Sequence, residues 1–349
     1  MSSDGNLVTL DSFREKRIST AKKGLAYAII SAITMVIFTL FNSTAQTIVL
    51  EMTGSDKLIT QIVVGLVVLA TAEFAAGIII IIYTMVMGTP LSEYKNLWGV
   101  KASRFTILSA LAAGPVATCS LMIACTLCGV TYANSLLSLA PMVSAIAARI
   151  IFKEKPKVRV YIGIALAITG VIIASYEPPV GVENFYLGIL IATLSPIGFA
   201  IEAMLSSKVM DSTDPLEVCG LYRCLFGGIW GCLIALLICL FTGDMGLYAD
   251  VFKFTFTTPT TLIYFVVAAV FIAIEYGTIY VAYNYCGPTR GTAIVFSTPI
   301  WSIPIGYMLN GLFPYTVTPL GIIGAIVVVV GMVLIVLKPS ELFSLREFK

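Results

Sequence analysis

The sequence reads Cys128-Gly129-Val130-Thr131, then Pro141 and Ser144, and it repeats this pattern as Cys286-Gly287-Pro288-Thr289, then Pro299 and Ser302. The two copies are 158 positions apart (286 − 128 and 299 − 141). Beyond a short loop the separation becomes 161 positions, and Gly163, Gly170 and Pro178 correspond to Gly324, Gly331 and Pro339. Loops tolerate such a small insertion. The period is too long for a solenoid repeat, so it predicts a chain built from two related halves.

Composition predicts a membrane protein. The 349 residues are 58% hydrophobic and 11% charged, whereas a soluble domain has about a quarter of its residues charged. The net charge of +2 does not favour nucleic acid as a partner, and the chain has no histidine, the commonest proton shuttle and metal ligand. Cys125 and Cys128 resemble half of a metal or redox motif, but no second such pair accompanies them, so we interpret them as small packing residues.

Ten apolar segments each come close to the roughly 20 residues that a spanning helix needs. They cover about 24–50, 58–87, 104–127, 131–152, 159–176, 186–207, 216–241, 261–285, 290–311 and 317–337. Strands of a membrane β-barrel would be about 10 residues long and would alternate in polarity. The sequence therefore predicts an all-α polytopic membrane protein with ten transmembrane helices.

The basic residues predict the orientation of these helices. If the N-terminus lies in the cytosol, only Lys57 and Lys253 of the 21 lysines and arginines fall outside. Residues 1–23 and 339–349 are then cytosolic tails of a multi-pass protein in the cell membrane. The halves 24–176 and 186–338 hold five helices each and have opposite orientations. Two inverted five-helix repeats are an architecture of secondary transporters.

Several motifs resemble those of a known superfamily. The first half carries the run from Ala133 to Pro141, Phe152-Lys153-Glu154 and the stretch from Gly163 to Gly170, and the second half carries Ala282-Tyr283-Asn284-Tyr285, Pro299, Gly324 and Gly331, with Arg223 before them. The chain is identified as a member of the drug/metabolite transporter superfamily and resembles its ten-helix EamA-type branch. The resemblance implies export or exchange of small metabolites, often amino acids. It also implies a cavity between segments 1, 3, 4, 6, 8 and 9, with segments 5 and 10 at the periphery.

Four ionisable residues lie inside apolar segments, namely Glu73, Glu202, Arg223 and Glu275. Such residues are costly in lipid and are candidates for function. Their positions along the helices place all four in the cytosolic half of the membrane. We predict a gating or coupling layer, and a purely structural salt-bridge layer remains the alternative. A short loop joins segments 6 and 7, so we expect these two to be antiparallel neighbours, with Glu202 facing Arg223 and Glu73 or Glu275 left to take up a proton.

Uncharged polar residues form stripes on several segments. Helical spacing puts Asn42 and Gln46 on one face, and Tyr276, Tyr280 and Tyr283 on another. Others flank the prolines at which the repeat was found. The predicted substrate-binding residues are Asn42, Gln46, Asn134, Tyr276, Tyr280, Tyr283, Thr298 and Trp301. Ordinary helix packing and interhelical hydrogen bonds remain open as alternatives.

These features favour a secondary transporter, an exporter or exchanger that moves a small polar metabolite by alternating access, with an amino acid among the candidates and proton coupling as one route. The sequence carries no Walker motif for ATP, and we expect no enzymatic activity, metal or cofactor. A channel-like facilitator and a non-transporting scaffold remain alternatives. Three buried acids against one arginine favour a zwitterion or cation, since phosphorylated substrates need several basic groups. The expected partners are the substrate and the lipid bilayer, with no nucleic acid, and self-association into a homo-oligomer is left open.

Overall fold

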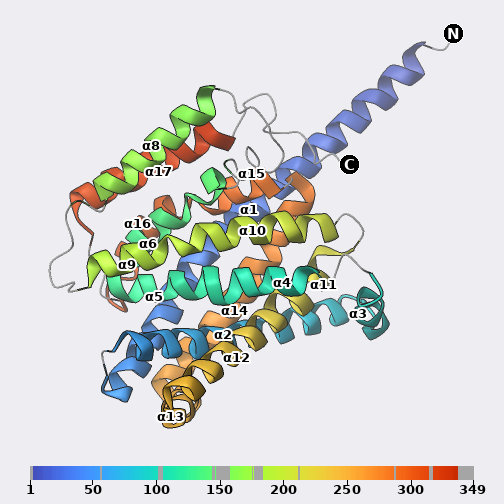
Figure 1. Ribbon diagram of the computed structural model, residues 1–349. Helices are drawn as coiled ribbons and strands as arrows, with labels where there is room; N and C mark the ends of the chain where they lie inside the picture. The colour runs from blue at the N-terminus through green and yellow to red at the C-terminus, as the bar shows by residue number, and fades with distance from the viewer. Residues whose placement is uncertain are drawn as a thin grey trace.

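The computed structural model describes residues 3–55, 57–100, 105–143, 146, 158–174, 176, 184–210, 213–286, 288–313 and 317–336. The regular structure in these ranges is helical throughout (Figure 1). The helices are α1 Ser3–Thr53, α2 Leu58–Val86, α3 Leu91–Leu97, α4 Phe105–Leu111, η2 Ala112–Thr118, α5 Cys119–Cys128, α6 Val130–Leu137, α8 Val158–Ala174, α9 Phe185–Ala192, α10 Leu194–Val209, α11 Pro215–Val218, η3 Cys219–Leu225, α12 Phe226–Thr242, α13 Met245–Thr257, α14 Pro259–Cys286, α15 Pro288–Val295, α16 Thr298–Met308 and α17 Pro319–Val336. Of these, η2 and η3 are π-helical.

Six stretches of helix in the described part of the chain are long and apolar enough to cross a membrane. They are Lys22–Thr53, Leu58–Val86, Thr106–Cys128, Phe185–Ser206, Pro215–Thr242 and Pro259–Tyr285. Tyr161–Ala174 and Pro319–Leu334 are shorter apolar helices. In the expected segment 131–152, positions 144–145 and 147–152 lie outside the described residues. The described part of the chain therefore has the all-helical architecture of a polytopic membrane protein.

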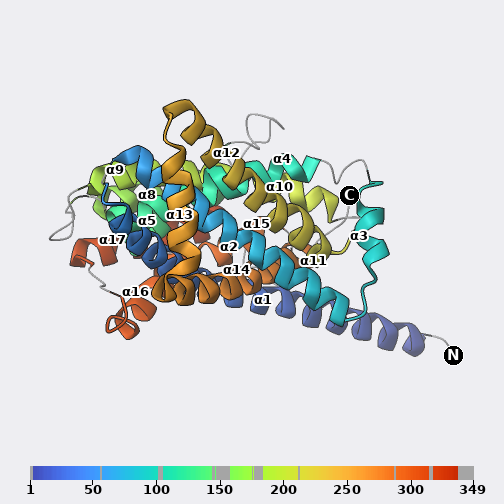
Figure 2. The same ribbon diagram turned by 90° about the horizontal axis from the view of Figure 1, so that it is seen from below.

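The first helix is much longer than the apolar segment that predicts it. It has 51 residues, which at about 1.5 Å each gives a length of about 76 Å, against a hydrocarbon core of about 30 Å. Its N-terminal part projects from the bundle (Figure 1), and α14 packs alongside much of the remainder (Figure 2). Within the range 1–23, expected to be a tail, residues 3–23 thus contribute a continuation of the helix.

The other helices form pairs that join distant parts of the sequence. Among the closest pairs are α2 with α12, α5 with α9, and α10 with η2. The expectation that segments 6 and 7 are direct neighbours is wrong, because α10 packs mainly against η2 and α4, whereas α12 packs mainly against α2. The short loop only limits how far apart the two helices begin. Helices α4 and η2 of the third segment pack against both α10 and α12.

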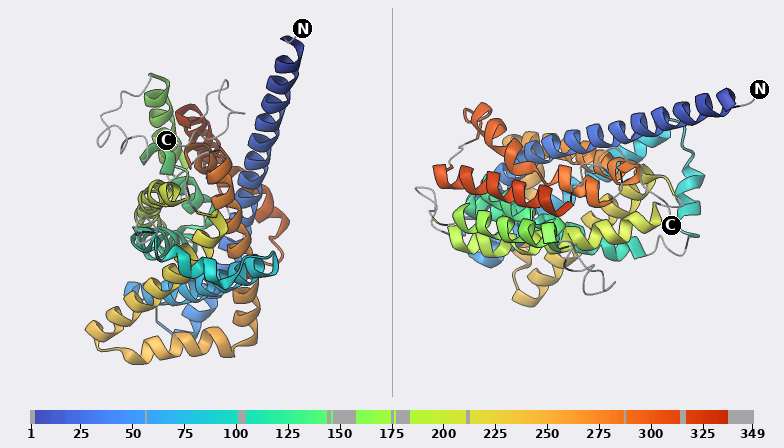
Figure 3. Two further views of the ribbon diagram at one scale, coloured as in Figure 1. Left: turned by 90° about the vertical axis from the view of Figure 1, so that its right-hand side faces the viewer. Right: turned by 90° about the horizontal axis from the view of Figure 1, so that it is seen from above.

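Two helices lie outside the ten predicted segments. In α3, Tyr94 is buried and its hydroxyl lies 2.5 Å from that of Thr84 on α2, and burial raises the pKa of Tyr94. Helix α13 begins where Asp244 accepts a hydrogen bond from the backbone N–H of Leu247, and it runs across the direction of α12 and α14 (Figures 2 and 3). Both helices are too short to span a membrane, so a search for spanning segments passes over them.

Two helices break at equivalent positions of the repeat. Helix α6 ends at Leu137 and α15 ends at Val295, 158 positions later (295 − 137), and a two-residue turn follows each. Proline has no backbone N–H to donate and fits the first turn of a helix, and Pro299 lies in the first turn of α16. The two breaks touch, because the hydroxyl of Ser138 donates to the backbone carbonyl of Phe296.

The pair α8 and α17 lies at one edge of the molecule (Figures 1 and 3). Its backbones approach so closely that a Cβ added to Gly170 would lie 2.8 Å from the carbonyl oxygen of Gly324. A Cβ added to Gly331 would lie 2.6 Å from the carbonyl oxygen of Gly163. Gly163 and Gly170 correspond to Gly324 and Gly331 in the repeat, so the contacts are reciprocal. Reciprocal contacts of this kind occur across a two-fold axis.

Candidate substrate and gating site

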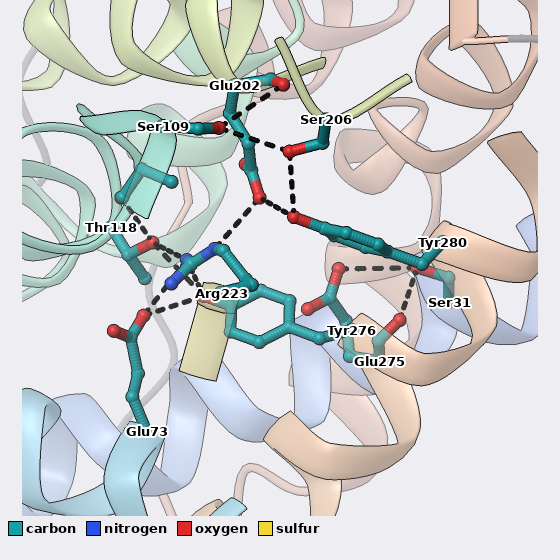
Figure 4. Close-up of polar contacts among 11 residues, drawn as sticks. Ser31, Glu73, Ser109, Thr118, Glu202, Ser206, Arg223, Glu275, Tyr276 and Tyr280 are labelled. Carbon is teal, nitrogen blue, oxygen red and sulfur yellow. Dashed lines mark hydrogen bonds and ion pairs between the residues drawn. The ribbon is translucent and has the colours of Figure 1, made fainter. Parts of the chain in front are cut away.

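Arg223 lies at the centre of a buried ionic network that joins several helices (Figure 4). Its Nη2 atom is 3.0 Å from Oε1 of Glu73 on α2, and its Nε atom is 2.9 Å from Oε1 of Glu202 on α10. The Nε contact is an ion pair without the direction of a hydrogen bond. All three side chains are almost fully buried. The structure thus places Glu202 against Arg223, as expected, and adds Glu73 to the same guanidinium.

Two tyrosines of α14 complete the network. The hydroxyl of Tyr276 donates to Glu73 Oε1 at 3.0 Å and lies 2.6 Å from Arg223 Nη2, and that of Tyr280 donates to Glu202 Oε1 at 2.9 Å. The guanidinium carbon of Arg223 also lies 4.1 Å from the centre of the Tyr276 ring. Each carboxylate therefore receives one phenol hydrogen bond in addition to its ion pair, which offsets part of the cost of burying it.

The two π-helical segments meet at this network. Segment η3 carries Arg223, and the hydroxyl of Thr118, the last residue of η2, accepts a hydrogen bond from Arg223 Nη2 at 3.0 Å. Pro115 within η2 lacks the N–H that a regular helix would use. Single π-helical turns occur often at functional sites. Nearby, a Cβ on Gly227 would lie 2.6 Å from Glu73 Oε2, so the space around that carboxylate depends on a glycine.

Glu275 lies in the same layer but outside the Arg223 ion pairs (Figure 4). It is 1% exposed, and its Oε1 atom is 3.3 Å from the hydroxyl of Ser31 on α1. Its other carboxyl oxygen, Oε2, has no hydrogen-bond partner in the described structure. Glu275 is therefore the buried acid of the layer without an ion pair among the described side chains.

The uncharged residues predicted to bind substrate fall into two groups. Asn42 accepts a hydrogen bond from Gln46 at 2.7 Å, but its own amide nitrogen has no partner. Neither polar atom of the Asn134 side chain, nor the Thr298 hydroxyl, has a hydrogen-bond partner among the described residues. All of these side chains are buried, and their helices α1, α6 and α16 pack against one another. Buried polar groups are normally satisfied, so the unpartnered atoms of Asn42, Asn134 and Thr298 are exceptions among the described residues.

The second group is already engaged within the protein. Tyr276 and Tyr280 belong to the ionic network, and Tyr283 packs against Gly291, where a Cβ would lie 2.7 Å from its ring. Trp301 is half-buried, and its indole nitrogen donates to Ser297 at 3.3 Å.

Sequence reasoning did not assign Ser31, Thr118 or Ser206 to the site. Ser206 lies 3.1 Å from the hydroxyl of Tyr280. Many hydroxyl side chains in this chain instead bond to carbonyls of their own helix, as Thr71 does. The residue type alone therefore gives no signal for the three that reach across helices.

Cavities lie around the bundle in the described part of the chain, and three of them are large enough to hold a small molecule. One of about 340 Å³ opens outward and is lined by apolar residues of α2 and α14 with Tyr27 of α1. A second, of about 500 Å³, lies between α2, α12 and α13 and is also apolar. The third, of about 400 Å³, is polar and includes Lys57, Asp244 and Asp250 near the start of α2 and of α13.

The sequence of residues 49–335 matches the profile of the Triose-phosphate Transporter family. The chain belongs to this family. The match covers most of the chain and both halves of the predicted repeat, and it confirms the resemblance to the drug/metabolite transporter superfamily. This member of the Triose-phosphate Transporter family is therefore a membrane transporter of a small metabolite.

Two further comparisons found a similar sequence and a similar fold. The chain is 26% identical to Protein LicB of Haemophilus influenzae over 203 residues. This aligned region covers 58% of this chain and 65% of the length of LicB. It thus spans slightly less than two thirds of this curated relative. A solved crystal structure of a protein shares the fold with a TM-score of 0.53 and 12% identity, over 88% of this chain and 96% of the other.

Proposed function

We propose that this protein is a secondary transporter that moves a small zwitterionic or cationic metabolite by alternating access. The observation that carries the proposal is the charge of the interior. Among the described residues, Arg223 is the one buried lysine or arginine, and Glu73 and Glu202 already neutralise it. The family name refers to triose phosphates, but a phosphate group requires free basic groups to bind it. Net negative charge favours a substrate with a positive group.

The architecture that we propose is ten transmembrane helices in two inverted repeats, covering 24–176 and 186–338. The contact between the breaks of α6 and α15 and the reciprocal contacts of α8 with α17 support it. In transporters of this kind, discontinuous helices form the substrate site where the repeats meet. Asn134 lies one turn before the first break and Thr298 lies just after the second. Together with Asn42 they are the proposed hydrogen-bonding groups for the substrate.

The Arg223 network is the proposed gate. It ties α2, α10, η3 and α14 together through charged groups that are shielded from water. Water that enters this layer would raise the local dielectric constant and weaken each ion pair. The distribution of lysine and arginine supports a location of the layer in the cytosolic half of the cell membrane, with both termini cytosolic. Closure of the network thus corresponds to a transporter that is shut toward the cytosol.

The test is flux into proteoliposomes that contain the purified protein. Radiolabelled amino acids and small cations should show saturable uptake and accelerated exchange, while sugar phosphates should show neither. Asn134→Ala should lower the rate at least severalfold with unchanged expression. Ser135→Ala is the matched control, because that buried hydroxyl donates only within its own helix, to Thr131. Uptake that does not saturate would indicate a channel, no uptake of any compound would indicate a scaffold, and exchange of sugar phosphates would overturn the substrate class.

A further inference from the structure

We infer that Glu275, held by Ser31, binds the proton that couples substrate movement to the proton gradient. This inference rests on the transport function proposed above and assigns one residue of the layer to coupling. Sequence reasoning left Glu73 and Glu275 as equal candidates. The contacts separate them, because Glu73 is ion-paired with Arg223 at 3.0 Å whereas Glu275 lies outside the ion pairs.

The immediate surroundings of Glu275 suit a carboxyl group that exchanges a proton. The Ser31 hydroxyl lies 3.3 Å from Oε1 and 3.2 Å from the backbone carbonyl of Glu275. It has a single hydrogen, so it can satisfy one of these acceptors at a time. The remaining oxygen, Oε2, is buried and without a partner. A carboxylate with at most one hydrogen bond costs far more to bury than a neutral carboxyl in the same place.

The charges that face Glu275 do not compensate it. Arg223 on η3 is attractive, while Glu202 on α10 and Glu73 on α2 are repulsive. On α1, the side chain that bonds to Glu275 is Ser31, which does not titrate. The side chain of Arg290 on α15 lies outside the described residues. One guanidinium thus faces three carboxyl groups, and its short contacts are with the other two. A third negative charge is unfavourable until water or a cationic substrate reaches the site.

Glu275 also lies beside an open apolar cavity. The apolar cavity of about 340 Å³ is lined by Ala273, Ile274, Gly277 and Thr278, which flank Glu275 on α14. A hydrophobic reagent can enter such a groove from the bilayer. Dicyclohexylcarbodiimide is suitable because the O–H of a protonated carboxyl adds across its C=N bond, and the adduct rearranges to a stable acylurea with no leaving group.

The first experiment is labelling of the purified, full-length protein with dicyclohexylcarbodiimide across a pH series, read by peptide mass spectrometry. We expect Glu275 to be modified at acidic pH and the yield to fall as pH rises. Glu275→Gln keeps the shape of the side chain and a hydrogen bond to Ser31, and should abolish the label. Glu73→Gln is the matched control and should leave it. Label on Glu73 or Glu202 instead, no label on Glu275 at any pH, or protection by sodium ions at constant pH would overturn the assignment.

The second experiment measures coupling with the transported compound from the proteoliposome panel. With the membrane potential clamped at zero, exchange for one proton across a one-unit pH gradient sustains up to about tenfold accumulation. Glu275→Gln should retain exchange of labelled for unlabelled substrate but lose this accumulation. Accumulation by the variant equal to that of the wild type would refute the coupling role. If the wild type transports nothing, the function proposed above fails, while the labelling result still decides whether Glu275 binds a proton.

Discussion

Arg223 stabilises two carboxylates that come from different helices, so its removal differs from the removal of either acid. Arg223→Gln leaves Glu73 and Glu202 buried without a positive charge, whereas Glu202→Gln leaves Arg223 paired with Glu73 at 3.0 Å. Breaking a buried pair by removing one partner costs about 3 to 5 kcal/mol. We expect Arg223→Gln to lower the unfolding temperature in detergent well below that of Glu202→Gln. Equal unfolding temperatures for the two variants would contradict a shared ionic network.

A second prediction at the residue scale concerns the glycine beside the ion pair. A Cβ on Gly227 would lie 2.6 Å from Glu73 Oε2 and 2.9 Å from Arg223 Nη1, so Gly227→Ala must displace the pair. We expect transport to fall at least tenfold with membrane insertion retained. Gly277→Ala is the control in a spanning helix, because its nearest neighbour would be an ordinary 3.4 Å contact with Leu216. Full activity of Gly227→Ala would show that the pair tolerates displacement.

Residues that cost the most free energy to place in an apolar segment were the easiest to predict from the sequence. Ionisable groups in apolar segments are so unfavourable that their positions alone identified all four members of the layer. Hydroxyl groups carry no such signal, since a serine or threonine can satisfy itself on its own helix. Ser31 and Thr118 therefore became visible only when the structure placed them against Glu275 and Arg223.

At the scale of elements, composition located the apolar helices but not their partners. Apolar length predicts a spanning helix, and this agrees with α2 and α14 within a few residues. It contains no information on which faces meet, so the arrangement with η2 and α4 against α10 was missed. The glycines that marked the repeat form the contact of α8 with α17, but the sequence did not assign these two helices to each other.

The contact of α8 with α17 predicts that equivalent substitutions at Gly170 and Gly331 have similar effects on stability. A Cβ at Gly170 would lie 2.5 Å from the backbone nitrogen of Val328, and one at Gly331 would lie 2.5 Å from that of Ala167. Both backbones must separate, so Gly170→Ala and Gly331→Ala should lower the unfolding temperature by similar amounts. Gly311→Ala, which would meet nothing within 4 Å, should have no such effect. Clearly unequal losses from the two glycines would argue against the reciprocal arrangement.

For the whole molecule, the sequence predicted orientation from charge, and the structure supplies an independent length argument. Helix α2 has 29 residues, or about 44 Å, which exceeds a hydrocarbon core of about 30 Å. Lys57 precedes it and Lys95 follows it on α3, so the two should lie on opposite sides of the membrane. Lys57 shares the polar cavity of about 400 Å³ with the first residues of α13. Lys253 on α13 should therefore lie on the same side as Lys57.

The matching experiment uses single cysteine substitutions and a membrane-impermeant maleimide on intact cells. Lys57→Cys and Lys253→Cys should react from outside, because both lysines are exposed and lie at the predicted outer end. Lys95→Cys, also exposed, should react only after the membrane is permeabilised, and the same is expected of Lys155→Cys, a position outside the described residues. The unsubstituted protein gives the background, since its described cysteines are free and mostly buried. Reaction of Lys57→Cys and Lys95→Cys from the same side would mean that α2 does not cross the membrane. A complete reversal of the pattern would keep the fold but place the Arg223 network at the outer side, and the gate would then close against the opposite compartment.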